Sequence, residues 1–149
     1  MSTPEQGEQA LAEAVVRKML ADDAFSRWLG IEVLEVAPGQ CVCRMVVREE
    51  MVNGFSVAHG GITYAFADSA LAFACNTHGR VTMAVENGIG YPAAVHVGDE
   101  LVATAQEEAV SNRLGYYSVT VHNQRDEVVA TFRGTVYRTK REHFPESHA

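Results

Sequence analysis

A single carboxylate stands inside the most apolar segment of the chain. Residues 60–76 (GGITYAFADSALAFACN) leave almost no polar face, which predicts a helix buried on most of its sides, and Asp68 lies in its middle. An ionised carboxylate removed from water costs several kcal/mol unless it is paired or hydrogen-bonded. Asp68 is therefore a candidate catalytic acid, base or nucleophile. The alternative is a structural role, in which Asp68 reaches solvent or pairs with an arginine such as Arg44.

The start of the same helix offers groups of the opposite polarity. Gly60 and Gly61 place unhindered backbone N–H groups at a helix N-terminus, where partial positive charge collects. Such groups can hold an oxygen that gains negative charge in a transition state. Taken alone, the two glycines equally suit a tight entry from loop to helix. Together with Asp68 on the same apolar helix, they indicate a reaction at a polarised carbonyl group.

The spacing of these groups makes a prediction about assembly. Gly60 and Asp68 are eight positions apart in the sequence, which is about 12 Å along a helix axis at about 1.5 Å per residue. One copy of the helix cannot readily bring both groups to the same carbonyl carbon. Two copies, side by side and antiparallel, can do so, and the spacing therefore predicts an active site shared across a two-fold homodimer.

Periodicity predicts the elements that position this helix. Residues 1–28 form an N-terminal helical segment, in which Thr3 and Gln6 make a capping box. Alternation with a period of two predicts strands at 31–37, 40–48, 81–91, 101–110, 115–123 and 128–138. The charged tail 139–149 is expected to be mobile. One long helix segregated from antiparallel strands makes residues 1–149 a single α+β domain.

Composition excludes several classes of protein. The 47% of hydrophobic residues and the 21% of charged residues are globular values, so a disordered or fibrous chain is excluded. A net charge of −7 argues against non-specific binding to nucleic acid or an anionic membrane, since both need a basic surface. No apolar run is long enough to span a membrane, and the first residues lack the features of a signal peptide. The cysteines and histidines lack metal-ligand spacing, so we expect no metal site and a cytoplasmic location.

The segment MVNGFSVAHGGITYAFADSALAFACNTHG resembles the central motif of the hot-dog-fold acyl-CoA thioesterases. The resemblance is to the PaaI-like branch (phenylacetic acid degradation) of the 4-hydroxybenzoyl-CoA thioesterase-like group. It runs from about residue 29 to 137 and is most specific over 53–76, where N-G, H-G-G, A-D-[ST] and A-x-A-C-N occur in order. It implies a hot-dog fold, an antiparallel sheet wrapped around one long central helix, and homodimers that pair into homotetramers.

The resemblance also implies a reaction. Relatives of this kind hydrolyse an acyl-CoA to a free acid and CoA, and the implied acyl group is phenylacetyl or a ring-hydroxylated relative. CoA is part of the substrate, and no separate cofactor is implied. The family's carbonyl-polarising glycine falls on Gly60 and its catalytic carboxylate on Asp68. Asp68 would activate water as a general base, or attack directly to give a mixed anhydride.

Four further positions carry roles implied by the resemblance. Asn53 in the preceding loop and Ser69 beside the carboxylate would orient the carboxylate or the water. His59, just before the glycines, would either contact the thioester region or fix the loop by hydrogen bonding. Gly61 would add a second contact to the substrate at the helix start.

The chain departs from the family pattern after the helix. Many relatives carry an aromatic-Leu-Arg-Pro stretch where this chain has Tyr91-Pro92-Ala93-Ala94, so an arginine near the CoA phosphates is missing at Ala93. The turn at Asn112 and Arg113 matches a basic turn of relatives and is our first candidate for phosphate contact. Second candidates are Arg138, Lys140 and Arg141. An alternative function is a hot-dog module that binds acyl-CoA without hydrolysing it.

Overall fold

The computed structural model describes residues 3–145. The helices are α1 (Pro4–Asp22), α2 (Ala24–Leu29), the short 3-10 helix η1 (Glu49–Met51) and α3 (Gly60–Asn76). The strands are β1 (Glu32–Ala37), β2 (Gln40–Val46), β3 (Arg80–Gly90), β4 (Glu100–Val110), β5 (Leu114–His122) and β6 (Val128–Glu142).

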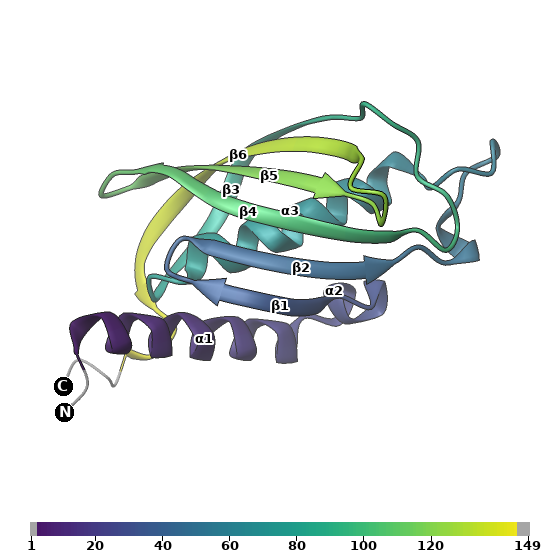
Figure 1. The fold of residues 1–149 in the computed structure, drawn as a ribbon. Coiled ribbons are helices and arrows are strands. Elements are labelled where there is room, and N and C mark those ends of the chain that lie inside the picture. The colour runs from purple at the N-terminus through teal and green to yellow at the C-terminus, as the bar shows by residue number, and fades with distance from the viewer. Residues whose placement is uncertain (1–2, 146–149) are drawn as a thin grey trace.

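The six strands form one antiparallel sheet that curves around α3. Their order across the sheet is β1-β2-β4-β5-β6-β3 (Figure 1). Within residues 3–145, β3 pairs with β6 alone, so β3 is an edge strand although it follows α3 directly in the chain. The α+β class and the sheet wrapped around one central helix are confirmed.

The core fills the space between the concave face of the sheet and α3. The helix buries Phe66, Leu71 and Phe73, and the strands bury alternate residues that face them. In β2 these inward positions are Cys41, Cys43 and Met45, all fully buried. Cys75 of α3 is buried as well, and all three cysteines are free thiols. The apolar character of α3 therefore reflects burial on most of its sides, as the sequence predicts.

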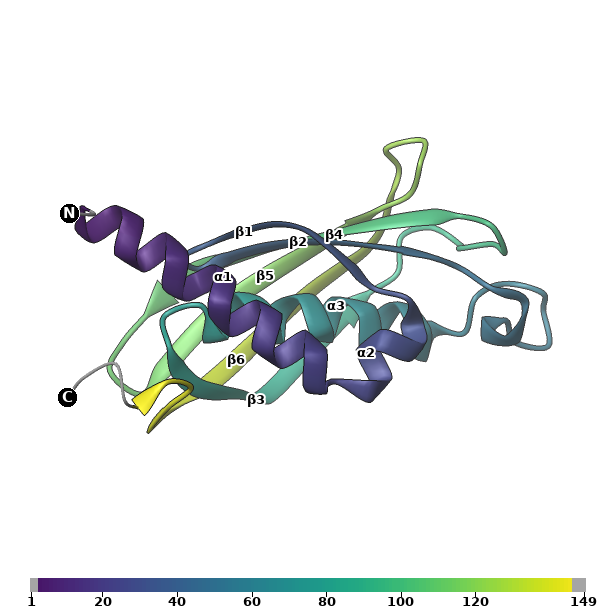
Figure 2. The same ribbon diagram turned by 90° about the horizontal axis from the view of Figure 1, so that it is seen from below.

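The two N-terminal helices lie alongside α3 and β1 (Figure 2). The capping box at the start of α1 is present, with the Thr3 N–H donating to Gln6 Oε1 and the Gln6 N–H to Thr3 Oγ1. Asp23 caps α2 by accepting a hydrogen bond from the Ser26 N–H at 2.9 Å. The helix α2 ends at Gly30, whose φ of 78° favours glycine. Between its two caps, α2 contacts the middle of α3 through the Ser26 and Ser69 hydroxyl groups.

The last strand is longer than the sequence predicts. β6 continues to Glu142, so residues 139–142 of the predicted mobile tail belong to the sheet, while 146–149 lie outside the described residues. The Thr139 hydroxyl donates to the Val81 carbonyl, and the His143 N–H donates to the Gly79 carbonyl at 2.8 Å. These bonds, and pairing with the start of β3, hold residues 139–142 in the sheet. The segment is polar and has no apolar alternation, so nothing in the sequence indicates that the strand continues.

No helix within residues 3–145 combines the length and the apolar character needed to cross a lipid bilayer.

Candidate active site

Asp68 is held by an amide and not by a cation. Its side chain is half-buried on α3, and Asn87 Nδ2 of β3 donates to Asp68 Oδ1 at 3.0 Å. Arg44, the cation considered from the sequence, instead pairs with Glu32 at 3.2 Å and with Glu100 at 2.7 Å. Structural pairing of Asp68 with Arg44 is therefore excluded.

The surroundings of Asp68 raise the pKa of its carboxyl group. Burial is the largest cause, because it disfavours the charged form, and the negative charge of Asp23 in α2 acts in the same direction. The hydrogen bond from Asn87 acts the other way, because it stabilises the carboxylate. A raised pKa makes the carboxylate a stronger base than one in water, which suits proton abstraction near neutral pH.

Asn87 is a functional candidate that sequence reasoning missed. Its Nδ2 donates to Asp68 and also to the Tyr64 hydroxyl at 3.1 Å, while its Oδ1 is buried without a hydrogen-bond partner. Gly134 of β6 gives the amide room, since a Cβ there would lie 2.5 Å from Asn87 Oδ1. The signal in the sequence was a polar residue at an inward position of a strand, two residues before the core-packed Ile89.

Replacing Asn87 by Leu should raise the pKa of Asp68 further. The variant removes the N–H that stabilises the carboxylate and puts an apolar side chain of similar size in its place. The pKa can be followed by ¹³C NMR titration of the Asp68 side-chain carboxyl group. Tyr64→Phe is the matched control, because it removes the other acceptor of Asn87 and leaves its bond to Asp68. An unchanged titration in Asn87→Leu would show that the amide does not stabilise the carboxylate.

The start of α3 is fixed by His59. Its Nδ1 accepts a hydrogen bond from the Gly61 N–H at 2.8 Å, which is the loop-fixing role of the two considered for His59. The same bond occupies the Gly61 amide in this chain, and the contact of Gly61 with the substrate stays a prediction. His59 is thus the N-cap residue of α3, and its ring satisfies the backbone N–H of Gly61 at the start of the helix.

Gly60 keeps its N–H available. Within residues 3–145 no acceptor is hydrogen-bonded to it, whereas the Gly60 carbonyl accepts from the Tyr91 hydroxyl at 2.7 Å. A Cβ at Gly60 would lie 3.1 Å from the Tyr91 hydroxyl oxygen, so the close approach of this tyrosine favours glycine. The first amide of α3 therefore points outward at the positive end of the helix.

Gly60, Tyr64 and Asp68 lie on one face of α3, at intervals of four residues. Strand β3 covers this face at Asp68 through Asn87, and Tyr91, the residue that follows β3, covers it at Gly60. No bond within residues 3–145 joins the helix start to Asp68. The two groups remain two turns of helix apart in one chain.

Asn53 and Ser69 are not bonded to Asp68 in the chain. Asn53 Oδ1 accepts from the Phe55 N–H at 2.8 Å and so stabilises its own loop. The Ser69 hydroxyl lies 2.8 Å from the Ser26 hydroxyl of α2, on a different side of α3 from Asn87. Both side chains are half-buried, and Asn53 Nδ2 has no hydrogen-bond partner among the described residues.

The turn between β4 and β5 gathers arginines at the far end of α3 from Gly60. Asn112 accepts from Arg80 through its backbone carbonyl at 2.8 Å, and Arg138 donates to the Ser111 carbonyl at 2.6 Å. Arg113 is exposed, and its side chain makes no hydrogen bond with the rest of residues 3–145. Arg113 is therefore the cation of this turn that is free to meet an anion.

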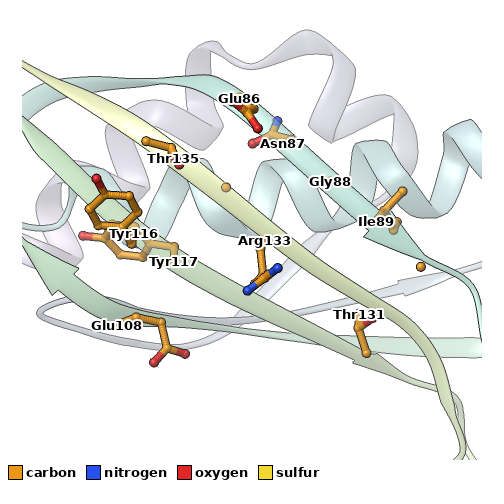
Figure 3. A pocket seen from close by; sticks show the side chains of 12 residues that line it. Glu86, Asn87, Gly88, Ile89, Glu108, Tyr116, Tyr117, Thr131, Arg133 and Thr135 are labelled. Carbon is orange, nitrogen blue, oxygen red and sulfur yellow. The ribbon is translucent and has the colours of Figure 1, made fainter.

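A cavity lies against β3, β4, β5 and β6, and Asn87, the donor to Asp68, is among its lining residues. It measures about 650 Å³, and Figure 3 shows Thr131, Arg133 and Glu108 among its lining residues. In β6, Thr131 and Arg133 alternate with Phe132 and Gly134, which face α3, so the cavity opens on the outer face of the sheet. No group of three His, Cys, Asp or Glu side chains within residues 3–145 is arranged to hold a metal ion.

Comparison with known proteins gives consistent similarities. Residues 55–130 match the family described as the Thioesterase superfamily. Acyl-coenzyme A thioesterase PaaI of Escherichia coli strain K12 is 36% identical over 120 residues, which cover 80% of this chain and 86% of that protein. Acyl-coenzyme A thioesterase 13 of Homo sapiens is 33% identical over 119 residues, 78% of this chain and 84% of that protein.

Among solved structures, the E. coli PaaI protein from the phenylacetic acid degradation operon aligns with a TM-score of 0.88 at 33% identity. The alignment covers 90% of this chain and 97% of that one. The segment that matches the family contains both Gly60 and Asp68.

Proposed function

The chain belongs to the thioesterase superfamily and is an acyl-CoA thioesterase, and from this premise we propose that it hydrolyses aryl-acetyl-CoA with Asp68 and the Gly60 N–H as its reacting groups. One observation carries the proposal: a half-buried carboxylate without a cation lies on the same helix face as an unpaired N–H at the helix start. The relation to a PaaI protein from a phenylacetic acid degradation operon supports the choice of an aryl-acetyl group.

In the proposed reaction the Gly60 N–H binds the thioester oxygen. The positive end of α3 stabilises the negative charge that this oxygen gains as the carbonyl carbon becomes tetrahedral. Asp68 takes a proton from water as the water oxygen adds to that carbon. The C–S bond then breaks, the CoA thiolate receives the proton from Asp68, and a carboxylic acid is released. Direct attack by Asp68, followed by hydrolysis of the anhydride, gives the same products.

We propose that the site is completed by a second copy of the chain. The support is the edge strand β3, which carries Met83 and Val85 with 54% and 61% of their surfaces exposed. Pairing of two β3 edges about a two-fold axis sets the two α3 helices side by side and antiparallel, which brings Gly60 of one copy toward Asp68 of the other. Association of two dimers into a tetramer stays a prediction of the family resemblance.

The same arrangement suits the CoA phosphates. In an antiparallel pair of helices, the C-terminal end of one α3 lies beside the Gly60 end of the other. Arg113 lies in the turn at that C-terminal end and has a free guanidinium group, so we propose it as a phosphate contact. The reaction needs no cofactor besides the CoA of the substrate.

The proposal is tested by a thiol-release assay over matched acyl-CoAs. Phenylacetyl-CoA and its ring-hydroxylated derivatives should have higher kcat/KM values than benzoyl-CoA and hexanoyl-CoA. A preference for the straight chain would contradict the aryl-acetyl substrate and leave the hydrolase in place. Tight binding of acyl-CoA in calorimetry with no thiol released from any substrate would favour the non-hydrolytic module.

A further inference from the structure

A chain of short hydrogen bonds joins the N-terminal segment to the residue beside Asp68. Ser26 Oγ of α2 lies 2.6 Å from Asp23 Oδ2 and 2.8 Å from Ser69 Oγ of α3. Ser26 is 1% exposed, so its hydroxyl has no access to water as an alternative partner. Figure 2 shows α2 lying against α3, where this contact is made. The family comparison assigns no role to α2, since the matched segment begins at residue 55.

The charge of Asp23 sets the direction of these bonds. A carboxylate only accepts hydrogen bonds, so the Ser26 hydroxyl donates to Asp23. The oxygen of Ser26 then has only lone pairs to offer to Ser69, and the Ser69 hydroxyl must be the donor. The only hydroxyl hydrogen of Ser69 is therefore donated to Ser26 of α2. Toward any other group its oxygen is an acceptor.

Asp23 also acts on Asp68 through space. The groups around Asp68 are Asn87 from β3, which is neutral, Tyr64 and Cys75 from its own helix, and Asp23 from α2. Asp23 is the only carboxylate among these neighbours, and its charge raises the pKa of Asp68. The residues at α2 thus accept a hydrogen bond from Ser69 and raise the pKa of Asp68.

We propose that Asp23 and Ser26 are positioning residues of the active site, which fix the Ser69 hydroxyl as a hydrogen-bond acceptor for a water or an amide N–H of the substrate. The inference rests on the proposed thioesterase reaction at Asp68. It assigns to α2, at the N-terminal edge of the domain, a part in the chemistry that neither the sequence motif nor the family match contains.

Asp23→Asn is the sharpest test, because it keeps the helix cap and reverses the chain of bonds. The side-chain oxygen of Asn must accept from the Ser26 N–H, so its NH₂ group faces Ser26 Oγ and donates. Ser26 then donates to Ser69, and the Ser69 hydrogen turns away from α2. We expect kcat to fall by about three- to tenfold, the kinetic equivalent of one neutral hydrogen bond, with KM little changed. The acid limb of the kcat/KM–pH profile should move to lower pH, because a negative charge near Asp68 is lost.

Two further variants separate positioning from stability. Ser26→Ala breaks the chain and should lower kcat by a similar factor, whereas Ser26→Thr retains the hydroxyl and should restore most of it. Asp22→Asn is the matched control, since Asp22 is an exposed neighbour that makes no hydrogen bond with this chain of residues. It should leave both kcat and the pH profile as in the wild type.

The assay includes wild-type protein with phenylacetyl-CoA, so that two failures can be told apart. Active wild type with unchanged kcat and pH profile in Asp23→Asn and Ser26→Ala would overturn the positioning role alone. The same conclusion follows if the losses match a fall in melting temperature and Ser26→Thr does not recover activity. Wild type that releases no thiol from any acyl-CoA would overturn the proposed function and this inference with it.

Discussion

Replacing Asp68 by Asn should lower kcat for acyl-CoA hydrolysis by about 10²- to 10⁴-fold, the usual contribution of a positioned general base. The amide cannot take the proton of the attacking water, and it cannot form an anhydride, so both routes through this residue are lost. The measurement is thiol release from phenylacetyl-CoA under saturating substrate. KM should change little, because the carboxylate acts on water or carbonyl carbon in the transition state.

Stability provides an internal check on this variant. The pKa of Asp68 is raised in the folded protein, mainly by burial, so the folded state favours the protonated form. The stability that this group contributes is therefore complete at low pH and is lost as pH rises through the folded pKa. Asn removes that loss, and the melting temperature at pH 7 should be equal to or above that of the wild type. Asp126→Asn, in an exposed turn, serves as the control for charge. Wild-type turnover in Asp68→Asn would eliminate the mechanism.

Replacing Gly60 by Pro should lower kcat by about 10²- to 10³-fold, which is the cost of one lost oxyanion donor. Proline removes the N–H that we assign to the thioester oxygen and adds a ring, and it is well accepted as the first residue of a helix. The preceding residue, His59, has φ −58° and ψ 134°, an extended conformation that suits a position before proline. Rates are compared at saturating substrate, with circular dichroism to verify the helix content.

Gly60→Ala is the matched control for this experiment. It adds a Cβ beside the Tyr91 hydroxyl, as proline does, but keeps the N–H. Alanine should therefore retain far more activity than proline. Equal losses in the two variants would attribute the effect to crowding at Tyr91 and would argue against a role for the backbone donor.

The helix and the strands could be predicted from the sequence because the pattern of apolar residues shows which positions are buried. The helix 60–76 was predicted with the bounds that the structure has, since its apolar run starts after His59 and ends before Gly79. The six strands were found from alternation, with ends shifted by one or two residues apart from β6. Asp68 stood out for the same reason, as a charge in a segment that must leave water.

The polar contacts of the site did not follow from the sequence. The sequence placed Ser69 beside Asp68 but did not show that its hydroxyl contacts Ser26, forty-three residues earlier in the chain. Gly61 was expected to bind substrate, and its amide is taken by His59, two residues away. Asn87 is contributed by an edge strand whose place beside α3 depends on the order of the whole sheet. Hydrogen bonds of this kind depend on tertiary placement, which periodicity does not specify.

The burial of all three cysteines has a practical result for kinetics. Cys41 and Cys43 have no exposed surface and Cys75 has 2%, so a chromogenic disulfide reagent meets no protein thiol while the chain stays folded. Colour that develops during turnover then counts liberated coenzyme alone. After the substrate is exhausted, any slow further increase in absorbance measures the rate at which local unfolding exposes the buried thiols. A single assay therefore reports both turnover and the opening of the core.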